Sequence, residues 1–376
     1  MKTKTTIGLL AGGIGAVLRA TDGKCAKITI DKKNLVVEAS GPDGYAKHVV
    51  DVEELGAQGT ASIDASVFGV VFGQESKSTE VNIEPVKDGL VLRFGGSRIK
   101  LRAPANDPIQ LFSEAKGKQE TKKLFTATGK EIKEAFSAAT EYASTHDVRA
   151  FLVAVLISNF NETLRVSASD GFIFHRLDTD LPLHKDAGDF AVLLPLPTAK
   201  SMCSVFGPEV KVEVRLLGNS LVEFITGNMT WVSRLVSGKF PSTDRFLRTE
   251  TKSKDEVIVA RDDLLVALAR IKALEAGEGA KKTVYGRAKF ADGTLTLNST
   301  DNEQVINLSC AKMRGMSDDF SYTCTILARA ISAIPTTKVL IRKDGADPKS
   351  FIFMRPCDDE DKPMKNWVAT AAPANI

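Results

Sequence analysis

Three segments of this chain share one pattern, in which an alternating strand ends in small hydroxylated residues. They are Leu35–Ser40, Leu164–Asp170 and Leu295–Asp301. The leucines that open them lie about 130 residues apart, whereas the units of solenoid proteins recur roughly every 20–50 residues. A period of this length is the size of a whole domain. The sequence therefore predicts three copies of one fold.

Each copy is predicted to contain two helices. The first helices are expected at Thr6–Ala20, after a cap at Thr128, and around the apolar stripe of Leu264, Leu268 and Ile271. The second helices are expected at Asp64–Phe72, Pro197–Phe206 and Ile326–Ile334. The remaining residues alternate as strands do. The predicted class is thus α+β, with antiparallel sheets and two helices in each copy.

Two segments rich in polar and charged residues, near 113–121 and 249–254, have the composition of linkers. We therefore expect domains at residues 1–115, 122–250 and 253–356. A C-terminal extension is expected at 357–376. It begins with an acidic run, Asp358–Asp361, and its simplest interpretation is a disordered tail.

The composition excludes several classes of protein. With 43% hydrophobic and 26% charged residues, the chain of 376 residues is typical of soluble globular proteins, and its net charge of +3 does not by itself indicate nucleic-acid binding. The N-terminus lacks the cleavage site of a signal peptide, and Phe151–Ile157 is too short to span a membrane. Five scattered cysteines without C-x-x-C spacing favour reduced thiols in a cytoplasmic protein: Cys25, Cys203, Cys310, Cys324 and Cys357.

No motif in the chain indicates a catalytic centre, a metal or a cofactor. The pair Gly13 and Gly15, with Asp31 after it, resembles part of a dinucleotide fingerprint, but the third glycine and the βαβ context are missing. The four histidines have no metal-ligand spacing: His48, His146, His175 and His184. A nucleotide-dependent enzyme is therefore a minor alternative, and we expect a protein without enzymatic activity.

Three segments together resemble one known family. They are Ala139–Leu152, Ala168–Phe174 and Gly238–Phe246, and they are similar to the middle domain of the bacterial DNA polymerase III beta subunit, the sliding clamp. The resemblance extends weakly over residues 1–356. It implies three clamp-type domains in each chain and a homodimer closed into a six-domain ring around duplex DNA. Its implied function is that of a processivity factor for DNA replication.

The resemblance also implies that helices carrying lysine and arginine face the DNA and hold phosphates without reading bases. The candidate residues are Lys24, Lys130, Lys133, Arg149, Lys200, Arg270 and Lys272. For each of them a solvated surface charge is the alternative, because acidic residues share these helices. Arg149 matches the D-V-R of the family's loop near DNA, although this loop is one residue shorter here and continues as Ala150-Phe151.

A second implied site is a hydrophobic pocket that binds short peptides of DNA polymerase and of the clamp loader. By resemblance its residues are Leu152, Ser169, Gly171, Phe172, Phe174, Pro241, Arg245, Phe246, Met354, Arg355 and Pro356. The alternative is that the apolar members are core residues. The family typically has Gly-His-Arg-Leu where this chain has Gly171–Phe174, so we expect a bulkier and more apolar pocket. We also expect Phe172, Phe174, Pro241, Phe246 and Met354 to be exposed there, with Arg245 and Arg355 at the rim.

The resemblance places the dimer seam near Ile109 and Leu274. Because family members end soon after the pocket, residues 357–376 suggest a flexible leash from which Trp367-Val368 competes with partner peptides. These departures from the family pattern, at Gly171–Phe174 and at residues 357–376, suit a clamp of a non-standard replication machinery, for example a viral one. The expected location is the bacterial cytoplasm or nucleoid, including that of an infected cell. The alternative function is a triplicated scaffold that binds proteins and does not encircle DNA.

Overall fold

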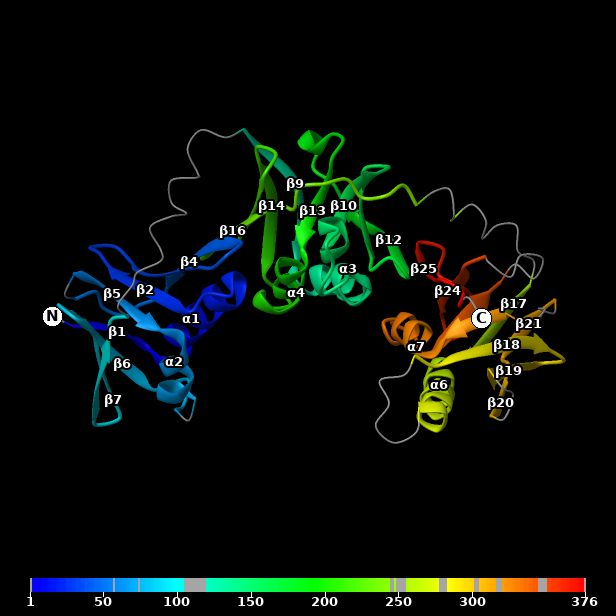
Figure 1. The fold of residues 1–376 in the computed structure, drawn as a ribbon. Helices are drawn as coiled ribbons and strands as arrows, with labels where there is room; N and C mark the ends of the chain where they lie inside the picture. Colours follow the sequence, from blue (N-terminus) through cyan, green and yellow to red (C-terminus); the bar gives the residue numbers. More distant parts are fainter. Residues whose placement is uncertain are drawn as a thin grey trace. The chain divides into compact units, whose positions relative to one another are not determined.

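The computed structural model describes residues 2–56, 58–73, 75–104, 120–243, 247, 255–276, 283–300, 304–315, 320–343 and 350–374 (Figure 1). The chain forms two compact units. One comprises residues Met1–Lys133, Leu181–Asp189 and Pro197–Val236, and the other Glu134–Asp180, Phe190–Leu196 and Ser237–Ile376. Each unit contains one large and one small sheet. The division into three domains stays a prediction, because the units are cut differently from the repeats.

The first unit holds an eight-stranded and a four-stranded sheet. The order in the large sheet is β5 (Gly59–Asp64), β2 (Cys25–Ile30), β3 (Leu35–Ser40), β4 (Gly44–Val50), β16 (Met229–Arg234), β15 (Leu221–Ile225), β14 (Lys211–Leu217) and β9 (Thr121–Thr128). The order in the small sheet is β1 (Thr3–Thr6), β6 (Glu80–Val86), β7 (Gly89–Phe94) and β8 (Ser97–Arg102). The helices are α1 (Ile7–Thr21), α2 (Ala65–Phe72) and α4 (Leu196–Val205), and η4 (Lys185–Ala187) is a short 3₁₀ turn.

The second unit holds a nine-stranded and a four-stranded sheet. The order in the large sheet is β13 (Ala191–Pro195), β10 (Ala154–Phe160), β11 (Thr163–Ser169), β12 (Ile173–Pro182), β25 (Trp367–Ala371), β24 (Ile352–Cys357), β23 (Lys338–Arg342), β17 (Glu256–Ala260) and β21 (Lys312–Arg314). The small sheet runs β20 (Val305–Ser309), β19 (Thr294–Ser299), β18 (Tyr285–Ala291), β22 (Phe320–Thr323). The helices are α6 (Arg261–Ala276) and α7 (Cys324–Ser332), with the 3₁₀ turn η3 (Ala150–Val153), while α3 (Gly129–Tyr142) is shared by both units.

The six predicted helices are confirmed within a few residues, and local sequence explains where they begin. Thr6 caps α1 by accepting a hydrogen bond from the amide of Leu9. Thr128 and Glu131 form a capping box at α3, because the carboxylate accepts the amide of Thr128 at 2.7 Å while the Thr128 hydroxyl accepts the amide of Glu131 at 3.3 Å. The predicted stripe of α6 is buried, since Leu264 is fully covered.

The repeated pattern extends to the way in which consecutive copies are joined. β4 of the first copy pairs with β16 of the second, and β12 of the second pairs with β25 of the third, both antiparallel. The order β17-β23-β24-β25 therefore repeats the order β9-β14-β15-β16. By this equivalence β25 is the last strand of the third copy.

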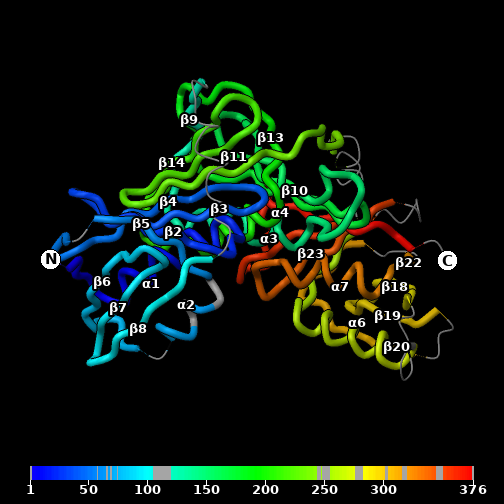
Figure 2. Tube along the Cα trace, turned by 60° about the vertical axis from the view of Figure 1, so that its left-hand side comes forward, coloured from blue at the N-terminus to red at the C-terminus, as the bar shows by residue number. Residues whose placement is uncertain are grey.

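The prediction of a disordered tail after Pro356 is therefore wrong. Trp367–Ala371 form a strand that is buried along its whole length and lies between β12 and β24. The acidic run Asp358–Asp361 belongs to the connection between β24 and β25, where Asp361 forms an ion pair with Lys338 at 2.7 Å. In the Cα trace of Figure 2 this C-terminal segment, in red, lies against green segments from the middle of the chain.

All five cysteines are free thiols in this structure. Among the described residues, no helix is long and apolar enough to cross a membrane. Within the same residues, no group of three or more potential ligands is arranged for a metal ion.

Candidate partner-binding turn and DNA-facing helices

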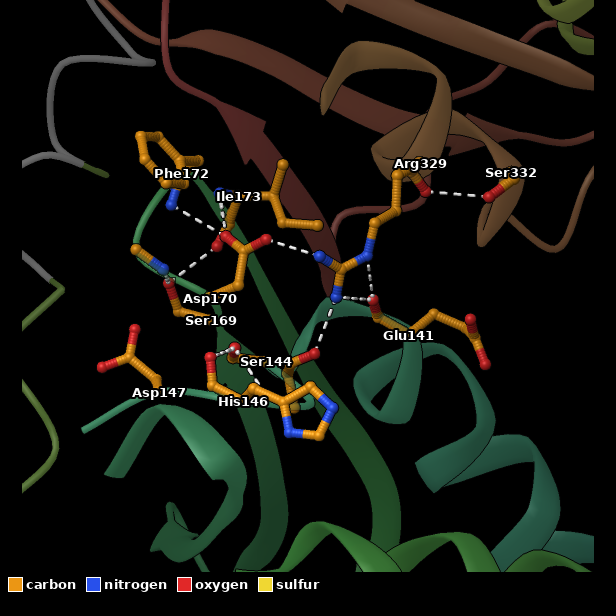
Figure 3. A network of polar contacts seen from close by, with 12 residues as sticks. Glu141, Ser144, His146, Asp147, Ser169, Asp170, Phe172, Ile173, Arg329 and Ser332 are labelled. Atoms are coloured by element: carbon orange, nitrogen blue, oxygen red, sulfur yellow. Dashed lines mark hydrogen bonds and ion pairs between the residues drawn. The ribbon is translucent and has the colours of Figure 1, made fainter. Parts of the chain in front are cut away.

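The predicted pocket centres on a tight turn between β11 and β12. The Asp170 carboxylate accepts the amides of Phe172 and Ile173, both at 2.8 Å, and the Ser169 hydroxyl accepts the amide of Gly171 at 3.1 Å (Figure 3). Gly171 has a φ of +96°, which only glycine adopts readily. The turn therefore holds the Phe172 side chain outward, with 57% of its surface exposed. An exposed phenylalanine on a fixed turn is a candidate anchor for an apolar partner.

Two further predicted residues adjoin this turn. A Cβ added to Gly171 would lie 3.1 Å from Nη2 of Arg149 and 3.6 Å from Cδ1 of Leu152. The ring of Phe240, which precedes the exposed Pro241, contacts the rings of Phe151 and Phe174 at centroid distances of 6.3 and 6.5 Å. Leu152 and Phe240 are buried, with 2% and 9% of their surfaces exposed, so they form the apolar core beneath the turn, from which Phe172 protrudes.

Several pocket residues are not placed as expected. Phe174 is only 4% exposed and Met354 is fully buried, so both are core residues. Met354 and Pro356 lie on β24, which β25 separates from β12, so they are not neighbours of the turn. Arg355 is not at a rim, because its guanidinium donates to the carbonyls of Met364, Lys365 and Trp367 at 2.8–3.1 Å. Arg245 and Phe246 lie outside the described residues.

The segment that adjoins the turn in their place is the end of the chain. Ala371 pairs with Ile173, and the amide of Ala372 donates to the carbonyl of Phe172 at 2.8 Å. Sequence reasoning missed these contacts because it placed Met354, Arg355 and Pro356 in the pocket and interpreted residues 357–376 as a tail. The internal repeat carried the missing signal, since a strand equivalent to β16 has to follow β24.

Arg329 on α7 was also missed. Its guanidinium donates to the Asp170 carboxylate at 2.5 Å and to the carbonyls of Glu141 and Ala143, each at 2.6 Å (Figure 3). Nothing in the sequence indicated this role, because two of its acceptors are backbone atoms more than a hundred residues away. Figure 3 shows that the network joins α7, the end of α3 and the turn.

Beneath the turn lies a buried aromatic cluster. The ring of His175 stacks on Tyr142 at 5.1 Å and meets Trp367 edge-on at 4.7 Å. The Tyr142 hydroxyl donates to the carbonyl of Ala330. Neither nitrogen of His175 has a hydrogen-bond partner among the described residues, and burial lowers the pKa of this imidazole to about 3. His175 is therefore neutral at physiological pH.

The seven candidate DNA-facing residues are all exposed, and they are distributed over both units. In the first unit Lys24 follows α1, Lys130 and Lys133 lie on α3, and Lys200 lies on α4. In the second unit Arg270 and Lys272 lie on α6. Exposed acidic residues share α3 and α6: Glu131, Glu134, Asp262 and Asp263. The role of the cations in DNA contact stays a prediction.

Arg149 has a different setting. Its Nε and Nη2 atoms donate to the two oxygens of Asp147, each at 2.9 Å, and these bonds lower the pKa of that carboxyl to about 2. This bidentate pair holds the guanidinium beside Gly171. Arg149 thus lies next to the exposed turn, and its contact with DNA stays a prediction.

The described residues include one of the two predicted seam residues, Leu274. Leu274 lies near the end of α6 with 61% of its surface exposed, and Val266, two turns earlier, is also exposed. Ile109 lies outside the described residues. An exposed apolar pair on one helix makes this face a candidate interface.

The segment around Gly13 and Gly15 lies within α1 and not at a turn between strand and helix. A Cβ on Gly13 would lie 2.8 Å from Cγ2 of Val50, so this glycine allows α1 to pack closely on β4. Gly13 therefore serves packing within a helix, and the minor alternative of a nucleotide-binding enzyme loses its motif.

Comparison with known proteins agrees with this architecture. Residues 126–242 match the family model of the DNA polymerase III beta subunit, central domain. The beta sliding clamp of Chlamydia muridarum is 23% identical over 225 residues, which are 59% of this chain and 58% of that protein. The chain thus spans little more than half of that relative. The beta sliding clamp of Pseudomonas putida is 24% identical over 321 residues, 81% of this chain and 84% of the relative.

Solved structures match the whole chain. The DNA polymerase sliding clamp of Pseudomonas aeruginosa with a ligand gives a TM-score of 0.83 at 17% identity, and the sliding clamp of that organism bound to griselimycin gives 0.82 at 17%. The beta subunit from Streptococcus pyogenes gives 0.82 at 19%. All three matches cover 100% of both chains. At such identities this likeness concerns the fold alone.

Repeated α+β copies that are joined through their sheets define a clamp-type protein. Together with the sequence matches, they show distant homology to the beta sliding clamp family, whose members are non-enzymatic factors of DNA replication. The relatives named here are bacterial, and the comparisons give no support to a viral origin. The ordered C-terminal strand also removes one of the departures that had suggested such an origin.

Proposed function

We propose that this protein is a homodimeric DNA sliding clamp, a processivity factor that encircles duplex DNA in the bacterial cytoplasm or nucleoid. The observation that carries the proposal is the repeated pairing between consecutive copies. β4 and β12 are equivalent strands, and so are their partners β16 and β25. The strand of the third copy that is equivalent to β4 and β12 is β20, and the strand of the first copy that is equivalent to β16 and β25 is β8. Each of them is the edge strand of its sheet. A second chain supplies the missing partner of each and closes the ring.

The register of β4 and β16 can be transferred to this seam. Met229 lies opposite His48 and Trp231 opposite Ala46 in the existing pair. Comparison of the β7–β8 pairing with the β15–β16 pairing makes Ser97 equivalent to Met229 and Ile99 equivalent to Trp231. Comparison of the β19–β20 pairing with the β3–β4 pairing makes Ile306 equivalent to His48 and Gln304 equivalent to Ala46. The proposed seam thus sets Ser97 against Ile306 and Ile99 against Gln304, antiparallel, near the exposed Leu274.

The contacts with DNA are proposed to be sequence-independent. The candidate cations lie on helices and loops, from which they can hold phosphates without reading bases. Neutralisation of phosphates and release of counterions then dominate, so binding weakens as salt is added. The test is retention on circular and on linearised DNA. A ring slides off free ends, whereas a protein held only by affinity is retained equally on both.

The exposed turn is proposed as the site where short apolar peptides of DNA polymerase and of the clamp loader bind. The support is the exposed Phe172 on a fixed turn, together with the exposed Pro241, whose neighbour Phe240 packs against Phe174. One large side chain contributes about 1.5–3 kcal/mol when buried, so a few anchors support micromolar binding after the cost of association. Griselimycin, bound by the Pseudomonas aeruginosa clamp, is a suitable probe of this site.

The alternative function, a scaffold that binds only proteins, is favoured by one observation. In the first copy α1 and α2 together carry a single charged side chain, Arg19. In α3 and α6 of the other copies acidic residues offset the cations. Equal retention on circular and linear DNA, with intact peptide binding, would establish the scaffold.

A further inference from the structure

The Asp170 carboxylate joins two structures with its two oxygens. One oxygen accepts the amides of Phe172 and Ile173 and thereby closes the exposed turn. The other accepts a hydrogen bond from Arg329 at 2.5 Å. The Asp170 side chain is 13% exposed, so this ion pair is partly shielded from water. Charge-assisted hydrogen bonds of this kind are stronger than neutral ones.

Arg329 is itself fixed by the end of α3. Its Nε donates to the carbonyl of Glu141 at 2.9 Å, and its Nη2 donates to the carbonyls of Glu141 and Ala143. These carbonyls belong to the last turn of the helix and the residue after it, where backbone acceptors lack partners and the helix dipole attracts a cation. A planar guanidinium can serve both the carbonyls and the carboxylate at once, whereas a lysine donates from a single nitrogen.

The first link between copies provides an internal comparison. Ser201 is equivalent to Arg329, because each lies six residues after the strand before its helix, and its hydroxyl donates to the carbonyl of Arg19 at 2.8 Å. Arg19 in turn is equivalent to Glu141, since each lies thirteen residues after the threonine that precedes its helix. Gly41 stands at the position of Asp170 and offers no carboxylate. The contact with the helix end is thus common to both links, whereas the tie to the turn occurs in the second link alone.

We infer that Arg329 is a positioning residue for the partner-binding turn and that it couples the conformation of Phe172 to α7. The inference rests on the proposed function of this turn in peptide binding. Arg329 contacts no partner in this scheme. It fixes Asp170, which fixes the backbone that presents Phe172. By linkage, a peptide that binds the ordered turn also stabilises the contact of Arg329 with Asp170.

The test compares full-length Arg329→Lys and Asp170→Asn with the unmodified chain. Asp170→Asn keeps an oxygen that can accept the two turn amides but removes the charge that holds Arg329. The control is Arg261→Lys, because Arg261 also donates to a helix-end carbonyl, that of Ile334 at 2.8 Å, and to Asp262 at 3.0 Å, but does not touch the turn. Thermal unfolding shows whether each variant is folded.

The first readout is hydrogen exchange at the amides of Phe172 and Ile173. We expect exchange to become about tenfold faster in Arg329→Lys and in Asp170→Asn, with no change at these amides in Arg261→Lys. The double variant should be no worse than either single one, because both remove the same contact. Unchanged exchange in the two single variants, or effects that multiply in the double variant, would overturn the inference.

The second readout is the affinity for griselimycin. Loss of the ordered turn should weaken binding about tenfold in both variants and leave it unchanged in Arg261→Lys. Equal affinity of Arg329→Lys and the unmodified chain would contradict the role of Arg329 in presenting Phe172. If the unmodified chain does not bind griselimycin, the proposed peptide site fails, and hydrogen exchange alone decides whether Arg329 positions the turn.

Discussion

Replacement of Trp367 by alanine tests whether the C-terminal strand is part of the core. Trp367 is only 2% exposed, packs edge-on against His175 and lies 6.3 Å from the ring of Tyr142. Removal of a buried tryptophan side chain typically costs about 3–5 kcal/mol. A loss of 1 kcal/mol lowers the unfolding temperature by about 2–4 °C in a domain of roughly 150–250 residues. We therefore expect the transition of the second unit to fall by roughly 6–20 °C.

The matched control is Met364→Ala, because Met364 lies three residues earlier in the same segment but is exposed. It should leave the unfolding temperature within about 2 °C, as surface substitutions usually do. The unfolding transition is followed by near-ultraviolet circular dichroism. The signal of Trp231, which lies in the first unit, shows whether the effect is confined to the second unit. Equal and small shifts of the unfolding temperature in both variants would refute the conclusion that β25 is part of the core and would favour a flexible tail.

Four further outcomes are expected. Leu274→Asp should yield monomers in light scattering, since a desolvated charge in an apolar seam costs several kcal/mol; an unchanged dimer mass would remove this seam. Lowering the pH from 7 to 5 should reduce the free energy of unfolding by about 2 kcal/mol through His175, because its pKa is lower in the folded than in the unfolded state and the unfolded state binds the proton first. In denaturant titrations His175→Phe should lose this part of the pH dependence of stability. The same pH dependence in the variant and the unmodified chain would contradict this role of His175. Phe172→Ala should weaken griselimycin binding without changing the unfolding temperature, whereas Phe174→Ala should lower that temperature through about 3–5 kcal/mol of lost core packing; the reverse pattern would exchange their roles. Arg149→Ala should reduce retention on circular DNA equally for all sequences, and a sequence-dependent effect would argue against encirclement.

Most of the fold could be predicted because its signals are local. The helices follow from stripes such as Leu264, Leu268 and Ile271 and from caps such as Thr128, and both depend only on neighbouring residues. The three copies follow from strands that alternate because one face is covered. The site was less accessible, because its parts come from segments that are far apart in the sequence. Ser169 and Gly171 were found through a resemblance, whereas Asp170 and Arg329 were not predicted as site residues.

The errors in the pocket have one physical origin. Met354-Arg355-Pro356 has the local composition of a segment that ends a clamp chain, and the acidic run after it resembles a solvated tail. What decides the position of a strand in a sheet is its backbone pairing, which local composition does not contain. Once β25 is placed between β24 and β12, Met354 becomes a core residue and Ala371 becomes the neighbour of the turn.

The repeat requires a strand after β24 but does not show which residues form it, because the two links between copies preserve register but not side chains. β16 and β25 occupy equivalent places, yet β16 carries its tryptophan at its third residue and β25 at its first. Around β25 the space is filled by Tyr142 and His175, whereas the equivalent residues beside β16 are Ala20 and Ala46. Backbone hydrogen bonds fix the register of a pair whatever side chains it carries, provided that the volume is filled. The pairing is therefore kept in both links of this chain although the side chains that fill the space around the paired strands differ.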